Sequence, residues 1–189
     1  MKQLLTALVL CAHALPSAAQ SVIEVRMLGQ PLVYTDSGTV KGCGIRLLGQ
    51  LPVAVGSKKF RLFDGSANIY REGAALTKMI LMDVPMNSNP ATAKQERIAL
   101  SNFWLKAEGK SPAAARAGTY KESPSEKRAY LFAAAVEPTI DFIMGATYGD
   151  PVQVGLKWET DYDWVYVGRV ELSEEDRTRV GNCFEELTK

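Results

Sequence analysis

The chain has 189 residues, with 22 lysines and arginines against 21 aspartates and glutamates, a formal net charge of +1. At this length, with 47% hydrophobic residues, one ordinary domain with a sizeable core is expected. The balanced charge argues against a nucleic-acid partner and against an anionic membrane surface, because both favour a basic patch.

Residues 1–19 have the pattern of a cleavable signal peptide. Lys2 supplies the positive start, an apolar run from Leu4 to Leu15 follows, and Ser17 to Ala19 gives small residues before the cleavage point. The run is shorter than the roughly 20 residues that span a bilayer. We expect a leader at 1–19, one globular domain at 20–189, no transmembrane segment after cleavage, and a periplasmic or extracellular location. The alternative is a buried N-terminal helix.

The predicted leader decides how many cysteines remain in the mature domain. Cys11 lies within it, which leaves Cys43 and Cys183 as the remaining two of three cysteines. In an oxidising compartment such a pair predicts a disulfide. The alternatives are two free buried thiols or a zinc site, and two thiolates alone do not complete a tetrahedral zinc shell.

The position of the single histidine limits the catalytic and metal-binding chemistry open to the mature domain. The single histidine, His13, also lies in the predicted leader. Without imidazole the domain has no Ser-His-Asp or Cys-His catalysis and no His-ligated metal. The sequence therefore favours a protein that is not an enzyme, and it predicts no catalytic residue, no cofactor and no metal site.

Alternating apolar and polar residues predict strands through the first half of the chain. A hairpin around Asp64-Gly65 is expected from its turn chemistry. The predicted strands cover residues 22–28, 40–51, 59–62, 66–71, 76–84 and 97–107. Residues 108–127 are predicted as a surface loop with an edge strand near Tyr120.

The second half mixes helix and strand signals. A helix is predicted at about 137–148, with Pro138 in its first turn and Gly149 at its end. A hairpin of 152–158 and 164–169 follows. A C-terminal helix at about 174–187 starts from the N-cap Ser173. The fold class is therefore α+β, mainly β: an antiparallel β-sandwich or a curved sheet with two helices packed on it.

The predicted disulfide agrees with these elements. Cys43 alternates with Ile45 and Leu47 on the apolar face of its strand, and Cys183 lies on the apolar stripe of the C-terminal helix. The two cysteines can therefore meet without either leaving the buried face of its element.

Two groups of residues are candidate sites. Asp161, Tyr162, Asp163 and Trp164 combine acids and aromatics at a hairpin tip, where they could bind a sugar, a cation or a basic partner. The structural alternative is a polar turn with Trp164 in the core. Glu137 with Asp141, four residues apart on one helix face, could act as a glycosidase carboxylate pair. The alternative is that they stabilise the helix N-terminus.

The expected function is an exported, non-catalytic binding or accessory domain, acting in the bacterial periplasm or outside the cell on a protein, peptide or envelope component. One alternative is an inhibitor or protective protein against an envelope-degrading enzyme, with the loop at 108–127 or the tip at 159–163 as the inserted segment. The other is a hydrolase that uses carboxylates alone. A binding domain needs an exposed apolar patch or an open sheet edge, whereas the hydrolase needs two carboxylates about 5–10 Å apart in a deep cleft. The sequence leaves the oligomeric state open.

Overall fold

One large curled sheet organises the chain in the computed structural model, which describes residues 22–51, 56–86, 96–97, 100, 102–114, 121–122, 129–157 and 164–189. The strands are β1 (Val22–Glu24), β2 (Met27–Asp36), β3 (Thr39–Leu51), β4 (Lys59–Tyr70), β5 (Ala75–Pro85), β6 (Glu96–Arg97), β7 (Asn102–Ala107), β8 (Ala113–Ala114), β9 (Lys121–Glu122), β10 (Tyr130–Ala134), β11 (Pro151–Lys157) and β12 (Trp164–Glu171).

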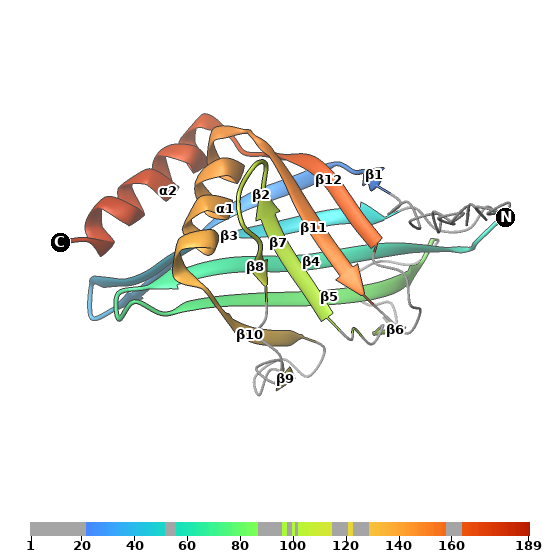
Figure 1. Ribbon diagram of the computed structural model, residues 1–189, viewed down its shortest axis with the longest axis horizontal. Helices are drawn as coiled ribbons and strands as arrows, with labels where there is room; N and C mark the ends of the chain where they lie inside the picture. The colour runs from blue at the N-terminus through green and yellow to red at the C-terminus, as the bar shows by residue number, and fades with distance from the viewer. Residues whose placement is uncertain are drawn as a thin grey trace, which may run out of the picture.

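These strands form a half-barrel with the order β8-β7-β11-β12-β2-β3-β4-β5-β10-β9, while β1 pairs with β12 and β6 with β5 (Figure 1). Consecutive strands from β2 to β5 are long antiparallel neighbours. Among the described strands, β12 pairs in parallel with both β1 and β2, and its pairing with β2 joins this meander to the β7–β11–β12 group. The predicted mainly β, α+β class is confirmed, as a curved sheet rather than a sandwich.

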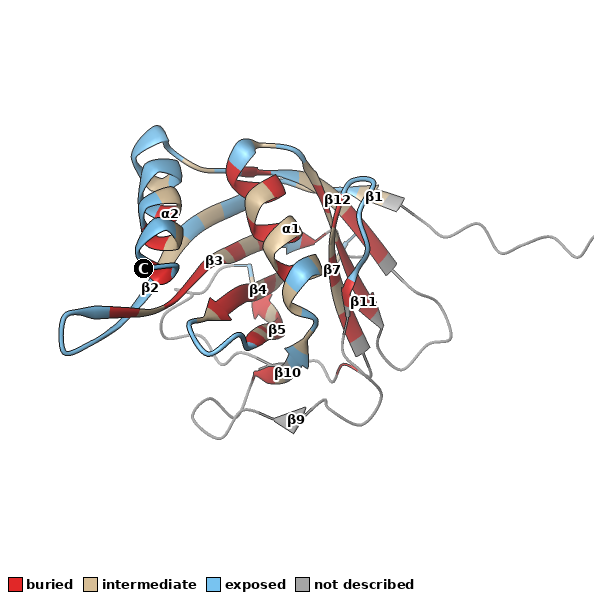
Figure 2. Ribbon diagram, turned by 60° about the vertical axis from the view of Figure 1, so that its left-hand side comes forward, coloured by how far each residue is buried: buried red, intermediate tan, exposed pale blue. Residues whose placement is uncertain are grey.

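Both helices, α1 (Val136–Tyr148) and α2 (Glu174–Leu187), pack on the concave face. Figure 2 shows their buried residues turned toward the sheet and much of α2 exposed on its far side. α1 fills the curl with fully buried Phe142, Ile143 and Ala146. It ends at Gly149, which has a φ of 81° and donates its N–H to the carbonyl of Ala146. Both helices match their predicted ranges to within one residue.

The disulfide pins α2 to the sheet, as predicted. Cys43 and Cys183 are bonded with their Cα atoms 5.8 Å apart, and each is at most 4% exposed. Val180 and Leu187 complete the buried stripe of α2. Ser173 caps the helix by accepting a hydrogen bond from the backbone N–H of Asp176 at 3.1 Å. The predicted C-terminal helix, its cap and its bridge are confirmed.

The Asp64-Gly65 turn prediction is wrong. β4 runs without a break from Lys59 to Tyr70, and both residues lie in mid-strand. Arg46 on β3 donates two hydrogen bonds to the Asp64 carboxylate, at 2.8 and 2.7 Å. Pairing with strands on both sides therefore overrides a local turn preference. The chain reverses later, before β5, around Gly73 at a φ of 74°.

The predicted strand at 22–28 is in fact two elements. β1 ends at Glu24, and β2 begins at Met27 and continues to Asp36, well beyond the prediction. The break is fixed by β12, because Gly168 lies against the chain there. A Cβ on Gly168 would come within 2.2 Å of the carbonyl oxygen of Val25. Only a residue without a side chain allows that approach.

The predicted strand at 97–107 is also divided. β6 pairs with β5, whereas β7 pairs with β11 and β8 in another part of the sheet. The predicted hairpin of β11 and β12 is confirmed by its antiparallel register. Of the predicted loop at 108–127, β8 and β9 are short edge strands and β9 adjoins the expected position near Tyr120. Residues 115–120 and 123–127 lie outside the described part.

Candidate functional site

Most of the predicted tip site falls outside the described residues. Asp161, Tyr162 and Asp163 are among those not described. Trp164 is placed only by its backbone, as the first residue of β12 opposite Leu156. The tip site therefore remains a prediction.

The predicted carboxylate pair on α1 is not gathered into one cavity. Asp141 is half-buried, lines a pocket and pairs with Lys110 at a distance of 3.4 Å between Oδ1 and Nζ. Glu137 is exposed and does not line that pocket. Glu137 and Asp141 lie on the same side of the helix, as their spacing predicts, but only Asp141 lines the pocket.

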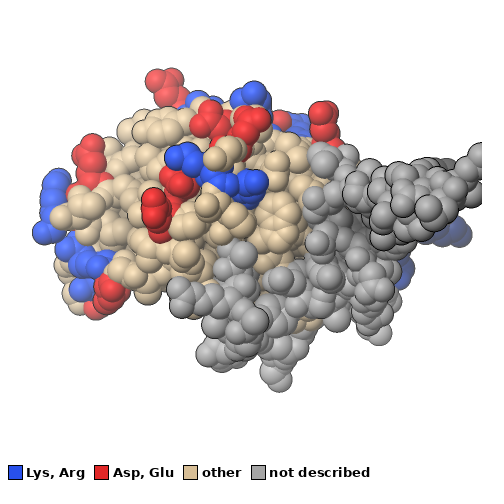
Figure 3. Space-filling model, viewed as in Figure 1, with Lys and Arg blue, Asp and Glu red and all other residues tan. Residues whose placement is uncertain are grey.

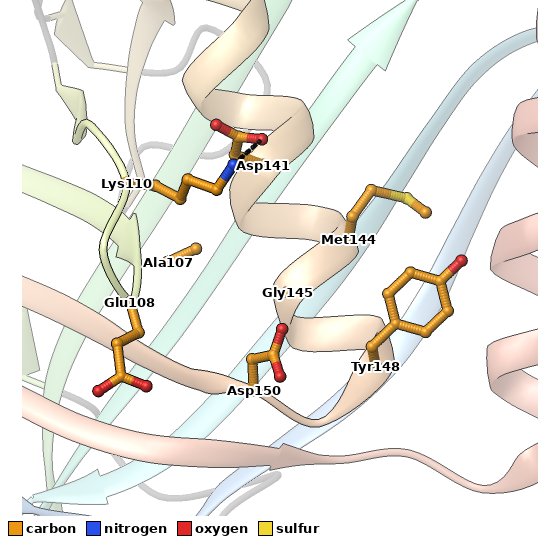
Figure 4. A pocket seen from close by; sticks show the side chains of 8 residues that line it. All are labelled: Ala107, Glu108, Lys110, Asp141, Met144, Gly145, Tyr148 and Asp150. Carbon is orange, nitrogen blue, oxygen red and sulfur yellow. Dashed lines mark ion pairs between the residues drawn. The ribbon is translucent and has the colours of Figure 1, made fainter.

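The pocket beside Asp141, here called the α1 pocket, is a hollow of about 420 Å³ between α1 and the turn that follows β7 (Figure 4). Its lining is Ala107, Glu108, Lys110, Asp141, Met144, Gly145, Tyr148 and Asp150. Its floor is made of small residues, since a Cβ on Gly145 would lie only 3.2 Å from the Cβ of Ala107. Longer side chains form the rim.

The electrostatics of the α1 pocket favour a cation. Three carboxylates line it against one amine, and Lys110 is already paired with Asp141. The carboxylates of Glu108 and Asp150 are exposed and have no hydrogen-bond or ion-pair partner among the described residues. The pocket also lies at the C-terminal end of α1, whose own last turn holds no basic residue, although Arg169 of β12 donates a hydrogen bond to the carbonyl oxygen of Gly149. That end carries the negative pole of the helix dipole.

The α1 pocket also presents an aromatic side chain. Tyr148 is 70% exposed, the most exposed of the large apolar side chains identified in the described part of the chain. Met144 extends beside it from the same helix (Figure 4). Tyrosine and methionine are enriched where proteins bind one another. Sequence reasoning missed this pocket because Glu108 and Asp150 lie 42 positions apart in the sequence.

A second surface is lined mostly by residues of β1, β2, β3, β4, β11 and β12. Two adjoining hollows of about 840 and 370 Å³ share Arg26, and together they are called the outer groove. The larger is lined by Glu24, Val25, Arg26, Pro151, Val167, Gly168, Arg169 and Glu171, and the smaller by Arg26, Leu28, Leu48, Gly49, Gln50 and Leu62.

An exposed ion pair lies where the two hollows meet. Arg26 donates from Nε and Nη2 to the two carboxylate oxygens of Glu171, at 2.7 and 2.6 Å. These hydrogen bonds raise the pKa of Arg26 and lower the pKa of Glu171. On the face of the molecule that carries the two helices, acidic and basic side chains are intermixed (Figure 3).

Burial raises the pKa of three tyrosines in the described part of the chain, Tyr34, Tyr70 and Tyr166. The hydroxyl of Tyr34 donates to Oδ1 of Asn68 at 3.1 Å, and its ring lies 5.5 Å from that of Tyr70. Burial raises the pKa of Tyr34 to about 12. Burial also raises the pKa of Tyr166, in the core, to about 12, against a smaller opposing effect of Arg61. Arg61 itself donates to the carboxylate of Asp83.

Alkaline pH is therefore expected to destabilise the protein between pH 10 and 12. A tyrosine in the unfolded chain ionises near pH 10, whereas Tyr34 and Tyr166 ionise at about 12 in the native state. The native state binds more protons in that interval, so the free energy of unfolding falls as pH rises and is unaffected by these groups below it. Tyrosinate absorbance in the native protein should show a set of late-ionising tyrosines that includes Tyr34 and Tyr166. Tyr34→Phe and Tyr166→Phe should each remove one of them, and ionisation of all seven tyrosines near pH 10 would contradict the assignment.

The described residues contain no group of three histidine, cysteine, aspartate or glutamate side chains that could hold a metal ion. No helix in the described part of the chain is long and apolar enough to cross a membrane. A scan against protein-family models found no match, and searches of curated proteins and of solved structures also found none.

Proposed function

We propose that this chain is an extracytoplasmic protein-binding domain, and that its α1 pocket receives a basic side chain of the partner. The observation that carries the proposal is a pair of exposed carboxylates, Glu108 and Asp150, around a hollow of about 420 Å³. Neither carboxylate has an ion-pair or hydrogen-bond partner within the described ranges. A lysine or arginine entering there would gain charge-assisted hydrogen bonds. Tyr148 would supply apolar contact area beside it.

The Cys43–Cys183 bridge supports the exported location in the proposal. Structural disulfides form and persist outside the reducing cytoplasm, and this one joins residues 140 positions apart. The signal peptide predicted at residues 1–19 would deliver the chain to such a compartment.

Binding fits the α1 pocket better than hydrolysis by carboxylates does. A carboxyl group that serves as a general acid needs an environment that keeps it protonated, such as burial among apolar side chains. Glu108 and Asp150 are instead exposed, and Asp141 is neutralised by Lys110. The same features suit recognition of a cation. The inhibitor alternative depends on loop segments that lie largely outside the described residues.

Site-specific photo-crosslinking in the source cells tests the proposal. A photoreactive residue at position 148 should trap a discrete partner, whereas one at position 178, exposed on α2, should not. Neutralising both carboxylates with E108Q and D150N should reduce the trapped product at least about tenfold, because a paired charge is lost at the contact. Raising the salt concentration should weaken the interaction.

The matched control is E185Q, which removes one exposed carboxylate from α2 and should leave crosslinking unchanged. Equal trapping at positions 148 and 178 would contradict the proposal. So would full trapping by a protein that carries both E108Q and D150N.

A further inference from the structure

We propose, independently of the function above, that the outer groove is the contact surface of a homodimer, in which a second copy of this chain packs against it across a two-fold axis. The groove has an apolar floor. Leu28 is 46% exposed and lies directly opposite Leu48 across β2 and β3, and Leu62 on β4 lines the same hollow. Apolar side chains gathered in a surface hollow mark a place of contact.

The charges of the groove select a second copy as the occupant. Its larger hollow is lined by two acidic residues, Glu24 and Glu171, and two basic residues, Arg26 and Arg169. A two-fold interface brings one patch against itself, so the patch must be complementary to itself. Equal numbers of opposite charges beside an apolar floor meet that requirement, whereas a patch of one sign would repel its own copy.

The Arg26–Glu171 pair has the geometry for such a contact. Its side chains are 75% and 50% exposed. A guanidinium has five N–H donors, and two of those on Arg26 bond to Glu171. No further acceptor for Arg26 is found among the described residues. The remaining donors can therefore bind Glu171 of the second copy, which gives a ring of four alternating charges.

Long-range electrostatic repulsion between two copies of the chain does not oppose dimerisation. The formal net charge of the chain is only +1, and proteins with a net charge near zero associate more readily than strongly charged ones. A foreign partner would be favoured instead if the groove carried a clear excess of one sign.

Sedimentation equilibrium of the disulfide-intact protein tests the proposal. The unsubstituted protein should form dimers, and L28D should raise the dimer dissociation constant at least about tenfold by burying a charge at the contact. The matched control is V33D on the same strand, where Val33 is 41% exposed but lies outside the groove. V33D should dimerise like the unsubstituted protein, and near-ultraviolet circular dichroism should show that both variants are folded.

A charge-swap experiment separates contact between copies from effects within one copy. R26E places two acidic side chains at the pair and E171R places two basic ones, so each variant alone should be monomeric. Mixed in equal amounts, the two should form a heterodimer, because opposite charges again face each other. Monomers at every concentration of the unsubstituted protein would overturn the proposal. A dimer whose dissociation constant is the same in L28D, R26E and V33D would also overturn it.

Discussion

Replacing Cys183 by serine is expected to lower the free energy of unfolding by about 3–5 kcal/mol. The bridge closes a loop with a sequence separation of 140 residues. In the chain-entropy model a loop of that size contributes up to about 5 kcal/mol by restricting the unfolded chain. At about 2–4 °C per kcal/mol for a domain of this size, Tm should fall by about 6–20 °C.

Reductant provides the control for the disulfide prediction. It should lower the Tm of the unsubstituted protein toward that of C183S and should not destabilise C183S further. Hydrogen exchange should locate the loss in α2, because that helix has only three buried residues, Val180, Cys183 and Leu187. The same sensitivity to reductant in both proteins would mean that the bridge does not contribute in solution.

Truncating Phe142 to alanine should cost about 3–5 kcal/mol. The side chain is fully buried on α1, among residues of the core cluster inside the curl. Removing a large aromatic side chain there loses its transfer free energy and leaves a cavity that rigid strands cannot close. Chemical denaturation should show a lower midpoint with little change in slope.

Tyr148→Ala is the matched control on the same helix. Tyr148 is 70% exposed, so its truncation should change stability by no more than about 0.5 kcal/mol. Comparable destabilisation by Phe142→Ala and Tyr148→Ala would contradict the position of α1 inside the half-barrel.

The two proposed surfaces can be told apart by experiment. They approach each other in the sequence, since Asp150 lines the α1 pocket and Pro151 lines the outer groove. L28D should nevertheless leave crosslinking at position 148 intact, and E108Q should leave the dimer dissociation constant unchanged. Loss of both properties in one variant would mean that partner binding and self-association depend on each other.

The disulfide is a feature that local sequence patterns were sufficient to predict. Alternation placed Cys43 on the buried face of a strand, and helical spacing placed Cys183 on the buried face of a helix. The Ser173 cap and the Gly149 C-terminus are also local features, because each depends on hydrogen bonds within about one helical turn. Both helices were therefore predicted nearly to the residue.

The wrong turn prediction at Asp64-Gly65 and the unpredicted α1 pocket are cases in which local patterns were insufficient to predict the structure. A DG pair has the same local preference in a turn or in mid-strand, and only pairing of β4 with β3 and β5 decides between them. The α1 pocket combines Glu108, Asp141 and Asp150 from a turn, a helix and a helix end.

By itself, the sequence determined the secondary structure class, both helices and the pairing of the two cysteines, because hydrophobic periodicity and capping act over a few residues. The tertiary structure alone decided that the sheet curls into a half-barrel, that both helices share its concave face, and which charges meet at the α1 pocket and the outer groove. Those outcomes depend on strand order and on contacts between distant residues such as Gly168 and Val25, which no local pattern encodes.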